Sequence, residues 1–127
     1  MANGTIAFDT LSTSGQIDGT ARSIDTDFLL NGCAKVWVNY VTAATFVNND
    51  SFNVASITDE GAGQALHNFT NAMANANFAY VGMSNDVTSG ASNTNKTTST
   101  CRQHAYNGSN ASTDAGENST IVTGELA

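Results

Sequence analysis

The stretch of sequence that decides the fold runs Gly32-Cys33-Ala34-Lys35-Val36-Trp37-Val38-Asn39-Tyr40 and continues, after a short gap, as Asp50-Ser51-Phe52-Asn53-Val54-Ala55-Ser56-Ile57-Thr58-Asp59. Between Lys35 and Tyr40 the side chains alternate in type and are mostly aromatic or β-branched, which suits a pleated strand with one buried and one exposed face. The residues from Phe52 to Ile57 alternate in the same way and lead into a run of turn-forming residues. The pattern therefore predicts two strands, the first of which contains Trp37, the only tryptophan.

Similar short alternating runs lie outward from this stretch, separated by polar turns. They predict strands near 33–47, 51–58, 64–70 and 77–84, a further strand over 97–106, a closing strand over 120–126 and a first strand over 5–9. Their regular spacing, without a convincing long helix, is typical of an all-β protein whose antiparallel sheets stack as a β-sandwich or a jelly roll. We expect a sandwich domain over residues 32–127, an N-terminal segment over 1–31, and a core that includes Trp37, Phe52 and Phe69.

The composition is poor in charge. Only 12% of the 127 residues are charged, about half the usual share, and Asn, Thr, Ser, Gly and Ala fill the deficit. Neutral hydrogen-bonding groups keep such a surface soluble, as in extracellular β-rich fibres and also in disordered segments. The alternation of apolar residues favours the fibre-like alternative, and the length suits one domain.

The charge balance excludes some classes of partner. The net charge is −7, and the four basic residues, Arg22, Lys35, Lys96 and Arg102, are too few to neutralise several phosphates. The longest apolar runs, such as Phe28 to Leu30, are far too short to span a bilayer. We therefore expect neither nucleic-acid binding nor membrane insertion.

Four pieces of the chain occur in an order that resembles a known module. The two stretches quoted first are followed by Asn68-Phe69-Thr70-Asn71-Ala72-Met73 and by Asn75-Ala76-Asn77-Phe78-Ala79-Tyr80. Together they resemble a β-sandwich module of tail-fibre and virion appendage proteins of tailed phages, especially marine and cyanobacterial phages. The resemblance covers about residues 28–82. This chain departs from the module's pattern at Cys33, Ala65 and Ala74, where a small residue, an aromatic residue and a proline are usual.

The resemblance implies a structural role on the surface of the phage particle. It implies a fibre-like appendage that takes part in host-surface attachment, assembles as a homotrimer and docks on other virion proteins through residues 1–31. The exposed loops expected at 85–96 and 107–118 would form the tip that contacts host surface glycans, and several copies would multiply weak contacts. One alternative is a capsid decoration or head-fibre protein, and another is a carbohydrate-binding module.

The candidate binding residues lie on the strand predicted at 97–106 and in the loops beside it. Arg102, His104 and Tyr106 share one face of that strand, and polar and aromatic groups on one face can bind a sugar. Asn93 and Asn110 lie in the neighbouring polar stretches and complete the candidate set. The competing interpretation, an ordinary exposed strand face, is the simpler one.

No catalytic or metal-binding motif is present in the sequence. The two histidines, His67 and His104, lie in different predicted strands, and we expect His67 on the solvent face beside Asn68. Calcium needs six to eight oxygen ligands, and the spacing of the acidic residues provides no such loop. We therefore expect a protein that is not an enzyme and has no cofactor and no bound metal.

The two cysteines leave two alternatives open. A disulfide between Cys33 and Cys101 would join the first core strand to a late one and would stabilise the fold by about 3 to 4 kcal/mol. Two free thiols are the preferred interpretation, because phage particles assemble in a reducing cytoplasm and a free cysteine packs well in a core.

Overall fold

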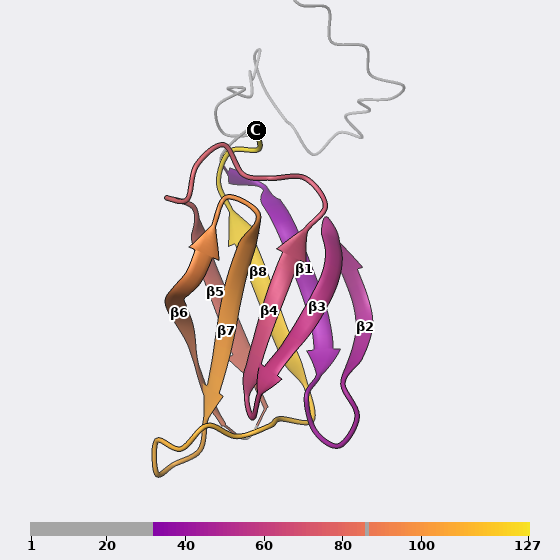
Figure 1. The fold of residues 1–127 in the computed structure, drawn as a ribbon, viewed down its shortest axis with the longest axis vertical. Helices are drawn as coiled ribbons and strands as arrows, with labels where there is room; N and C mark the ends of the chain where they lie inside the picture. Colours follow the sequence, from indigo (N-terminus) through magenta and orange to yellow (C-terminus); the bar gives the residue numbers. More distant parts are fainter. Residues whose placement is uncertain (1–31, 86) are drawn as a thin grey trace, which may run out of the picture.

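The chain forms a sandwich of two antiparallel sheets, which confirms the predicted all-β class. The computed structural model describes residues 32–85 and 87–127, so the strand predicted at 5–9 and the docking role expected of residues 1–31 lie outside the described residues. The strands are β1 (Ala34–Val41), β2 (Val47–Phe52), β3 (Val54–Gly61), β4 (Gln64–Phe69), β5 (Ala79–Ser84), β6 (Thr88–Thr97), β7 (Thr100–Tyr106) and β8 (Asn118–Thr123). Sheet A has the order β2-β1-β8-β5 and sheet B the order β3-β4-β7-β6. In Figure 1, β4 and β7 pass in front of β1 and β8.

Each sheet is built around a ladder that joins distant parts of the chain. β1 pairs with β8 at the centre of sheet A, and β4 pairs with β7 at the centre of sheet B. The chain passes from sheet A to sheet B through a single residue, Asn53, which has a positive φ of 59°. Asparagine tolerates this conformation better than most residues, and the Asn53 Nδ2 atom donates to Lys35 O at 3.1 Å. This bond ties the corner between the sheets to the start of β1.

Several strand boundaries differ from the prediction. The strand expected at 51–58 is divided at Asn53 between β2 and β3, and the strand expected at 120–126 spans 118–123. The strand expected at 33–47 ends at Val41, and residues 47–52 form a separate strand after a turn in which Ala44 has a positive φ of 62°. The loop expected at 85–96 is wrong, because residues 88–97 form the edge strand β6. An edge strand pairs on one side only, so the neutral polar residues of β6 can pair their backbone with β7 without a large apolar face.

The core contains a different set of side chains from the one predicted. Phe69 is 7% exposed and is confirmed as a core residue. Trp37 and Phe52 are 37% and 54% exposed, so their predicted core positions are wrong. The strand period explains this: β1 turns Val36, Val38 and Tyr40 inward, so Trp37 between them must face outward. Phe52 lies opposite Trp37 in the β1–β2 ladder and therefore shares the outer face.

The predicted solvent position of His67 is also wrong. Its neighbours in the alternation, Ala65 and Phe69, face the core, so His67 between them is fully buried. Its ring contacts the Tyr40 ring edge-on at 5.0 Å between centroids. Two clusters of apolar side chains lie between the sheets, one around Val36, Phe69, Met73, Phe78, Cys101 and Val122 and one around Val38, Tyr40 and Ala65.

Candidate functional site

The outer face of β7 brings together three of the predicted binding residues. Burial alternates along this strand, and the inward positions are Cys101, Gln103 and Ala105. Arg102, His104 and Tyr106 therefore share the outer face of sheet B, as the period of two predicts. We call these three residues the β7 strip.

Hydrogen bonds hold the aromatic part of the β7 strip in place. The Tyr106 hydroxyl lies 2.7 Å from His104 Nδ1, and the Ser112 hydroxyl lies 2.7 Å from His104 Nε2. The two rings are 4.0 Å apart between centroids. Desolvation, followed by the nearby charge of Arg102, lowers the pKa of His104 below its usual value. The lowered pKa favours the neutral form of the His104 ring, and each of its two nitrogen atoms lies within hydrogen-bond distance of a hydroxyl group.

An ion pair lies at the other end of the β7 strip. Arg102 Nη1 lies 3.2 Å from Glu60 Oε2, and Asn95 Nδ2 donates to Glu60 Oε1 at 3.1 Å. These contacts join β7 to β3 and β6, which are the two edge strands of sheet B. The opposite charges of Arg102 and Glu60 leave this part of the surface rich in hydrogen-bonding groups and close to neutral.

The side of His104 nearest the sheet edge is open. Gly90 of β6 lies directly opposite His104, so any side chain at Gly90 would stand on the same face. A Cβ atom added there would have no atom within 4 Å. Next to the His104 ring, the outer face of sheet B therefore has free space at a position where other strands carry a side chain.

The two predicted asparagines are placed differently from the strip. Asn110 has a positive φ of 58° and lies in the turn that follows β7, where Asn107 Oδ1 accepts from the backbone nitrogens of Ser109 and Ala111. The same turn returns the chain to Tyr106 through a bridge with Ser112. Asn93 lies in β6, within the stretch where the register with β7 shifts, and its side chain is not among those described.

The outer face of sheet A carries a second candidate surface that the sequence analysis missed. Four apolar side chains, Phe52, Trp37, Ile121 and Val81, lie in one row across β2, β1, β8 and β5. All four are exposed. One sequence signal could have indicated this surface. In β1, both the inward residues Val36 and Val38 and the residue between them, Trp37, are apolar, so the face opposite the core is apolar as well. We call these four residues the apolar row.

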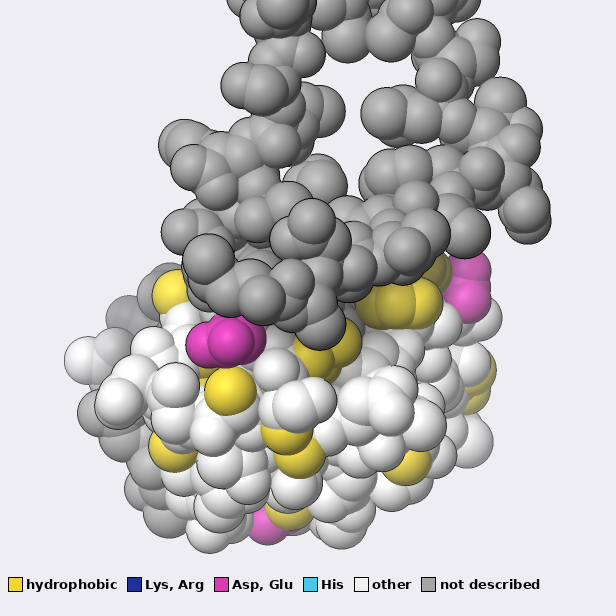
Figure 2. Space-filling view, turned by 90° about the horizontal axis from the view of Figure 1, so that it is seen from above, with side chains coloured by type: hydrophobic (Ala, Val, Ile, Leu, Met, Phe, Trp, Pro, Cys, Tyr) yellow, Lys and Arg dark blue, Asp and Glu magenta, His cyan; other side chains and the backbone are white. Residues whose placement is uncertain are grey.

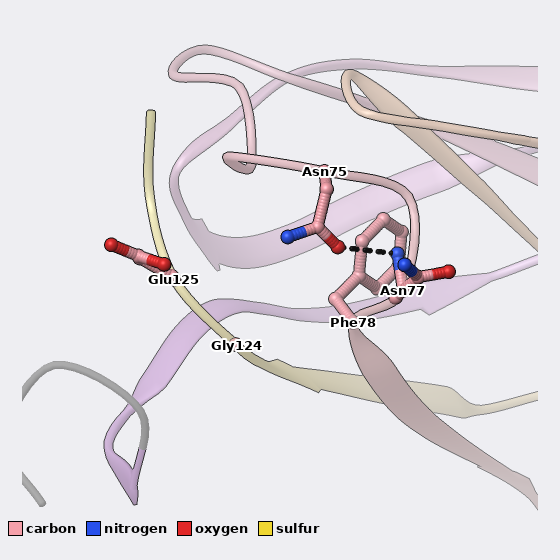
Figure 3. A pocket seen from close by; sticks show the side chains of 5 residues that line it. All are labelled: Asn75, Asn77, Phe78, Gly124 and Glu125. Atoms are coloured by element: carbon pink, nitrogen blue, oxygen red, sulfur yellow. Dashed lines mark hydrogen bonds between the residues drawn. The ribbon is translucent and has the colours of Figure 1, made fainter. Parts of the chain in front are cut away.

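A hollow of about 240 Å³ lies between the loop before β5 and the chain after β8. Its lining comes from Asn75, Asn77, Phe78, Gly124 and Glu125, as Figure 3 shows. The Asn75 side chain accepts from the Asn77 backbone nitrogen at 2.8 Å, so it shapes its own loop. The described lining of this hollow therefore has no feature that points to a particular ligand.

The end of the sandwich seen in Figure 2 shows mostly uncharged side chains and backbone where described residues are visible.

Within the described residues, two pairs of a histidine and a possible nucleophile lie close together, and neither has the surroundings of a catalytic pair. Cys101 Sγ lies 3.7 Å from His67 Nδ1, but burial raises the pKa of Cys101 to about 12 and lowers the pKa of His67 to about 4. Both groups are therefore neutral, unlike an activated thiolate and imidazolium pair. Ser112 has His104 as a base, but the adjacent backbone nitrogen of Thr113 donates to Ala105 O at 3.1 Å and cannot stabilise an oxyanion.

Three further observations concern metals, cysteines and membranes. In residues 32–85 and 87–127, no group of three or more His, Cys, Asp or Glu side chains is arranged to hold a metal ion. Cys33 is exposed and Cys101 is buried, and both are free thiols. The same residues include no helix with the length and apolar character that a membrane crossing requires.

Comparisons with known proteins add no relative. No protein-family model, no curated protein and no solved structure matches this chain. The functional inference therefore rests on the geometry of the two outer faces and on the sequence patterns.

Proposed function

We propose that this chain is a structural protein of a tailed-phage particle, a fibre-like appendage that contributes to attachment at the host surface. The observation that carries the proposal is the β7 strip, in which Arg102, His104 and Tyr106 are fixed on one outer face by hydrogen bonds and an ion pair. The resemblance of the stretches within residues 32–80 to phage appendage modules supports the same role. The attachment surface in this proposal is the outer face of sheet B.

The chemistry of the β7 strip suits a sugar. A sugar ring presents apolar C–H groups on its faces and hydroxyl groups at its rim, so a binding site needs an apolar ring beside several donors and acceptors. Tyr106 supplies the ring, and Arg102 and Glu60 supply donors and acceptors. The free space at Gly90 gives a ligand room to lie beside His104.

The fixed geometry of the β7 strip lowers the entropic cost of binding a ligand. Because the side chains are already held in place, little side-chain entropy is lost on binding. A shallow, open site of this kind binds one sugar weakly, and several copies in one particle multiply the affinity by linking the binding events. Attachment through repeated copies thus needs no deep pocket.

The proposed partners are other virion proteins, which would bind a segment outside the described residues. Residues 1–31 would dock the chain on other virion proteins. The resemblance implies a homotrimer, and the outer face of sheet A, treated in the next subsection, favours pairs of subunits instead. A capsid decoration or head-fibre protein of the same architecture is the alternative location. Copy number separates the two, because a capsid lattice carries hundreds of copies and a tail carries tens.

The proposal is tested on particles and on host cells. Quantitative mass spectrometry of purified phage particles should detect the chain and give its copy number. The purified chain, added in excess, should reduce adsorption of the phage to host cells. The Tyr106→Ala variant should lose this effect, whereas Leu126→Glu, which changes an exposed residue outside the β7 strip and the apolar row, should retain it. Absence of the chain from purified particles would refute the proposed role.

A further inference from the structure

The apolar row crosses the full width of sheet A. Phe52 lies opposite Trp37, Trp37 lies opposite Ile121, and Ile121 lies opposite Val81 in the strand registers. Their exposed fractions are 54%, 37%, 46% and 61% in that order. Side chains that are directly opposite on neighbouring strands are in contact range, so the row forms one continuous apolar band from edge to edge.

The band is large enough to form the centre of an interface. One more exposed apolar residue, Met83 on β5, lies two residues from Val81 and is 72% exposed. At roughly 100 Å² each, these five side chains leave on the order of 500 Å² of surface exposed, near the upper end of the largest patch on a typical monomer. A standard protein interface buries about 800 Å² per partner, including its polar rim. The band with its neighbours supplies that area.

The charged side chains beside the apolar row stand away from its centre. The row on one side consists of Ala79, Thr123 and Ala34, and the row on the other side of Met83, Ser119, Asn39 and Asp50. Asp50 stands on the edge strand β2. Lys35 is the extra residue where the β1–β8 register shifts, and the Glu117 carboxylate accepts from Asn39 Nδ2 at 3.0 Å. Asn39 Nδ2 donates to Ser119 Oγ at 3.2 Å, so the polar row is already hydrogen-bonded within the sheet. An apolar partner surface can cover this face without burying an unpaired charge at its centre.

We propose that a second copy of this chain covers the apolar row, face to face, about a two-fold axis parallel to β1 and β8. Along the row, the large side chains Phe52 and Trp37 stand on one half of the sheet, and the smaller Ile121 and Val81 stand on the other. The axis places Phe52 against Val81 of the partner subunit and Trp37 against Ile121 of the partner subunit. Each large side chain meets a smaller one, which keeps the spacing between the sheets even at about 10 Å.

The other face-to-face arrangement fits less well. A two-fold axis along the row would place Phe52 on its own copy and Val81 on its own copy, which crowds one edge and leaves a gap at the other. The sizes of the side chains therefore select the axis parallel to the strands.

The pairing of large with small side chains along the apolar row identifies a second copy of the chain as the partner. An interface about a two-fold axis uses the same patch on both subunits, and the size order along the apolar row pairs with itself only in reverse. One partner uses the whole width of the sheet, so this face predicts pairs of subunits and not the three-fold contact expected from the resemblance. The inference is independent of the attachment role, because the β7 strip lies on the other sheet.

The test is the native mass of the full chain, measured by light scattering and sedimentation over a concentration series. The monomer mass is 13.1 kDa, and the expected species is a dimer of twice that mass. Phe52→Glu and Val81→Lys should each weaken dimerisation at least tenfold. The double variant F52E/V81K should recover most of the lost affinity, because the axis places each new acid against the new base of the partner subunit.

The controls separate association from folding. Positions 52 and 81 lie three strands apart on one sheet, about 14 Å, so the new charges cannot pair closely within one subunit. Both residues are exposed, so circular dichroism and thermal unfolding should show folded single variants. Leu126→Glu changes an exposed apolar residue outside the row and should leave the dimer intact. A monomeric or trimeric wild-type chain, a dimer that survives both single changes, or a double variant that stays monomeric would overturn the inference.

Discussion

Trp37 lies directly opposite Phe52 in the β1–β2 ladder, and both aromatic side chains stand on the outer face of sheet A. The side chains between the sheets on β1 are Val36 and Val38, which are almost fully buried. The aromatic pair therefore belongs to the surface of the subunit and contributes little to its core.

The first prediction compares two phenylalanines. Phe52→Ala should lower the free energy of unfolding by less than about 1 kcal/mol, because an exposed ring buries little area on folding. Phe69→Ala should cost about 3 to 5 kcal/mol, because Phe69 packs in the core and contacts the Phe78 ring at 5.8 Å between centroids. Urea unfolding of both variants, at a concentration that keeps the chain monomeric, measures the difference. Equal losses would mean that Phe52 is a core residue.

The second prediction concerns the buried histidine. Burial lowers the pKa of His67 from 6.5 to about 4, so between these values the unfolded chain binds more protons than the folded chain. Stability should therefore fall as the pH drops from 6.5 to 4, by roughly 3 kcal/mol for this group. Above pH 6.5 the group is neutral in both states and has no effect on the pH dependence.

The His67→Leu variant isolates this effect. His67 Nε2 has no hydrogen-bond partner among residues 32–85 and 87–127, so an apolar side chain of similar size removes no bond of theirs at that atom. Urea unfolding at several pH values should show a smaller loss of stability between pH 6.5 and 4 in this variant than in the wild type. His104 is present in both chains, so the difference between the curves belongs to His67. Two parallel curves would contradict the assignment.

The third prediction concerns two glycines. A Cβ atom at Gly82 would lie 2.9 Å from Cγ of Gln103, whose amide donates to Met83 O at 3.2 Å and to Ser84 Oγ at 3.1 Å. Gly82→Ala should therefore cost about 1 to 3 kcal/mol, because Gln103 must move and lose these bonds. Gly90→Ala meets open space and should be neutral or stabilise the fold by about 0.4 to 1 kcal/mol. Thermal unfolding checks both, and a destabilised Gly90→Ala variant would show that the space beside His104 is filled.

The fourth prediction concerns the charge beside His104. Because the positive charge of Arg102 contributes to the lowered pKa of His104, Arg102→Gln should raise that pKa. Titration of the His104 ring by nuclear magnetic resonance measures the shift. Asp50→Asn, a change of charge on the outer face of the other sheet, is the control and should leave the pKa in place. If the pKa of His104 is the same in Arg102→Gln as in the wild type, the charge of Arg102 does not act on His104.

Much of the fold could be predicted from the alternation of side chains, but the facing of β1 could not. Val36, Trp37 and Val38 are all apolar, so the period of two gives two sets of positions without saying which set is buried. The choice depends on Tyr40, whose ring stacks on Phe46 at 5.7 Å between centroids and meets His67 in the core. The contact with His67 joins residues 27 positions apart, so the local pattern does not reveal it. β6 was missed because its pairing with β7, and not its composition, makes it a strand.

The candidate site was predictable in part. Arg102, His104 and Tyr106 occupy alternate positions of one strand, so their common face follows from the sequence. Glu60, Gly90 and Ser112 come from other elements, and the fold alone brings them to this face. When several strands contribute to one binding surface, the sequence pattern identifies only the residues that lie on the same strand.

Binding of the purified chain to a panel of surface-displayed glycans tests the attachment role of the β7 strip most directly. The account predicts that the wild-type chain binds at least one class of glycan when many copies are displayed. It further predicts that Tyr106→Ala and Gly90→Leu weaken this binding at least tenfold, the second by filling the space beside His104, while Gly90→Ala and Leu126→Glu leave it unchanged. A wild-type chain that binds no glycan, or variants of the β7 strip that bind as well as the wild type, would contradict the account.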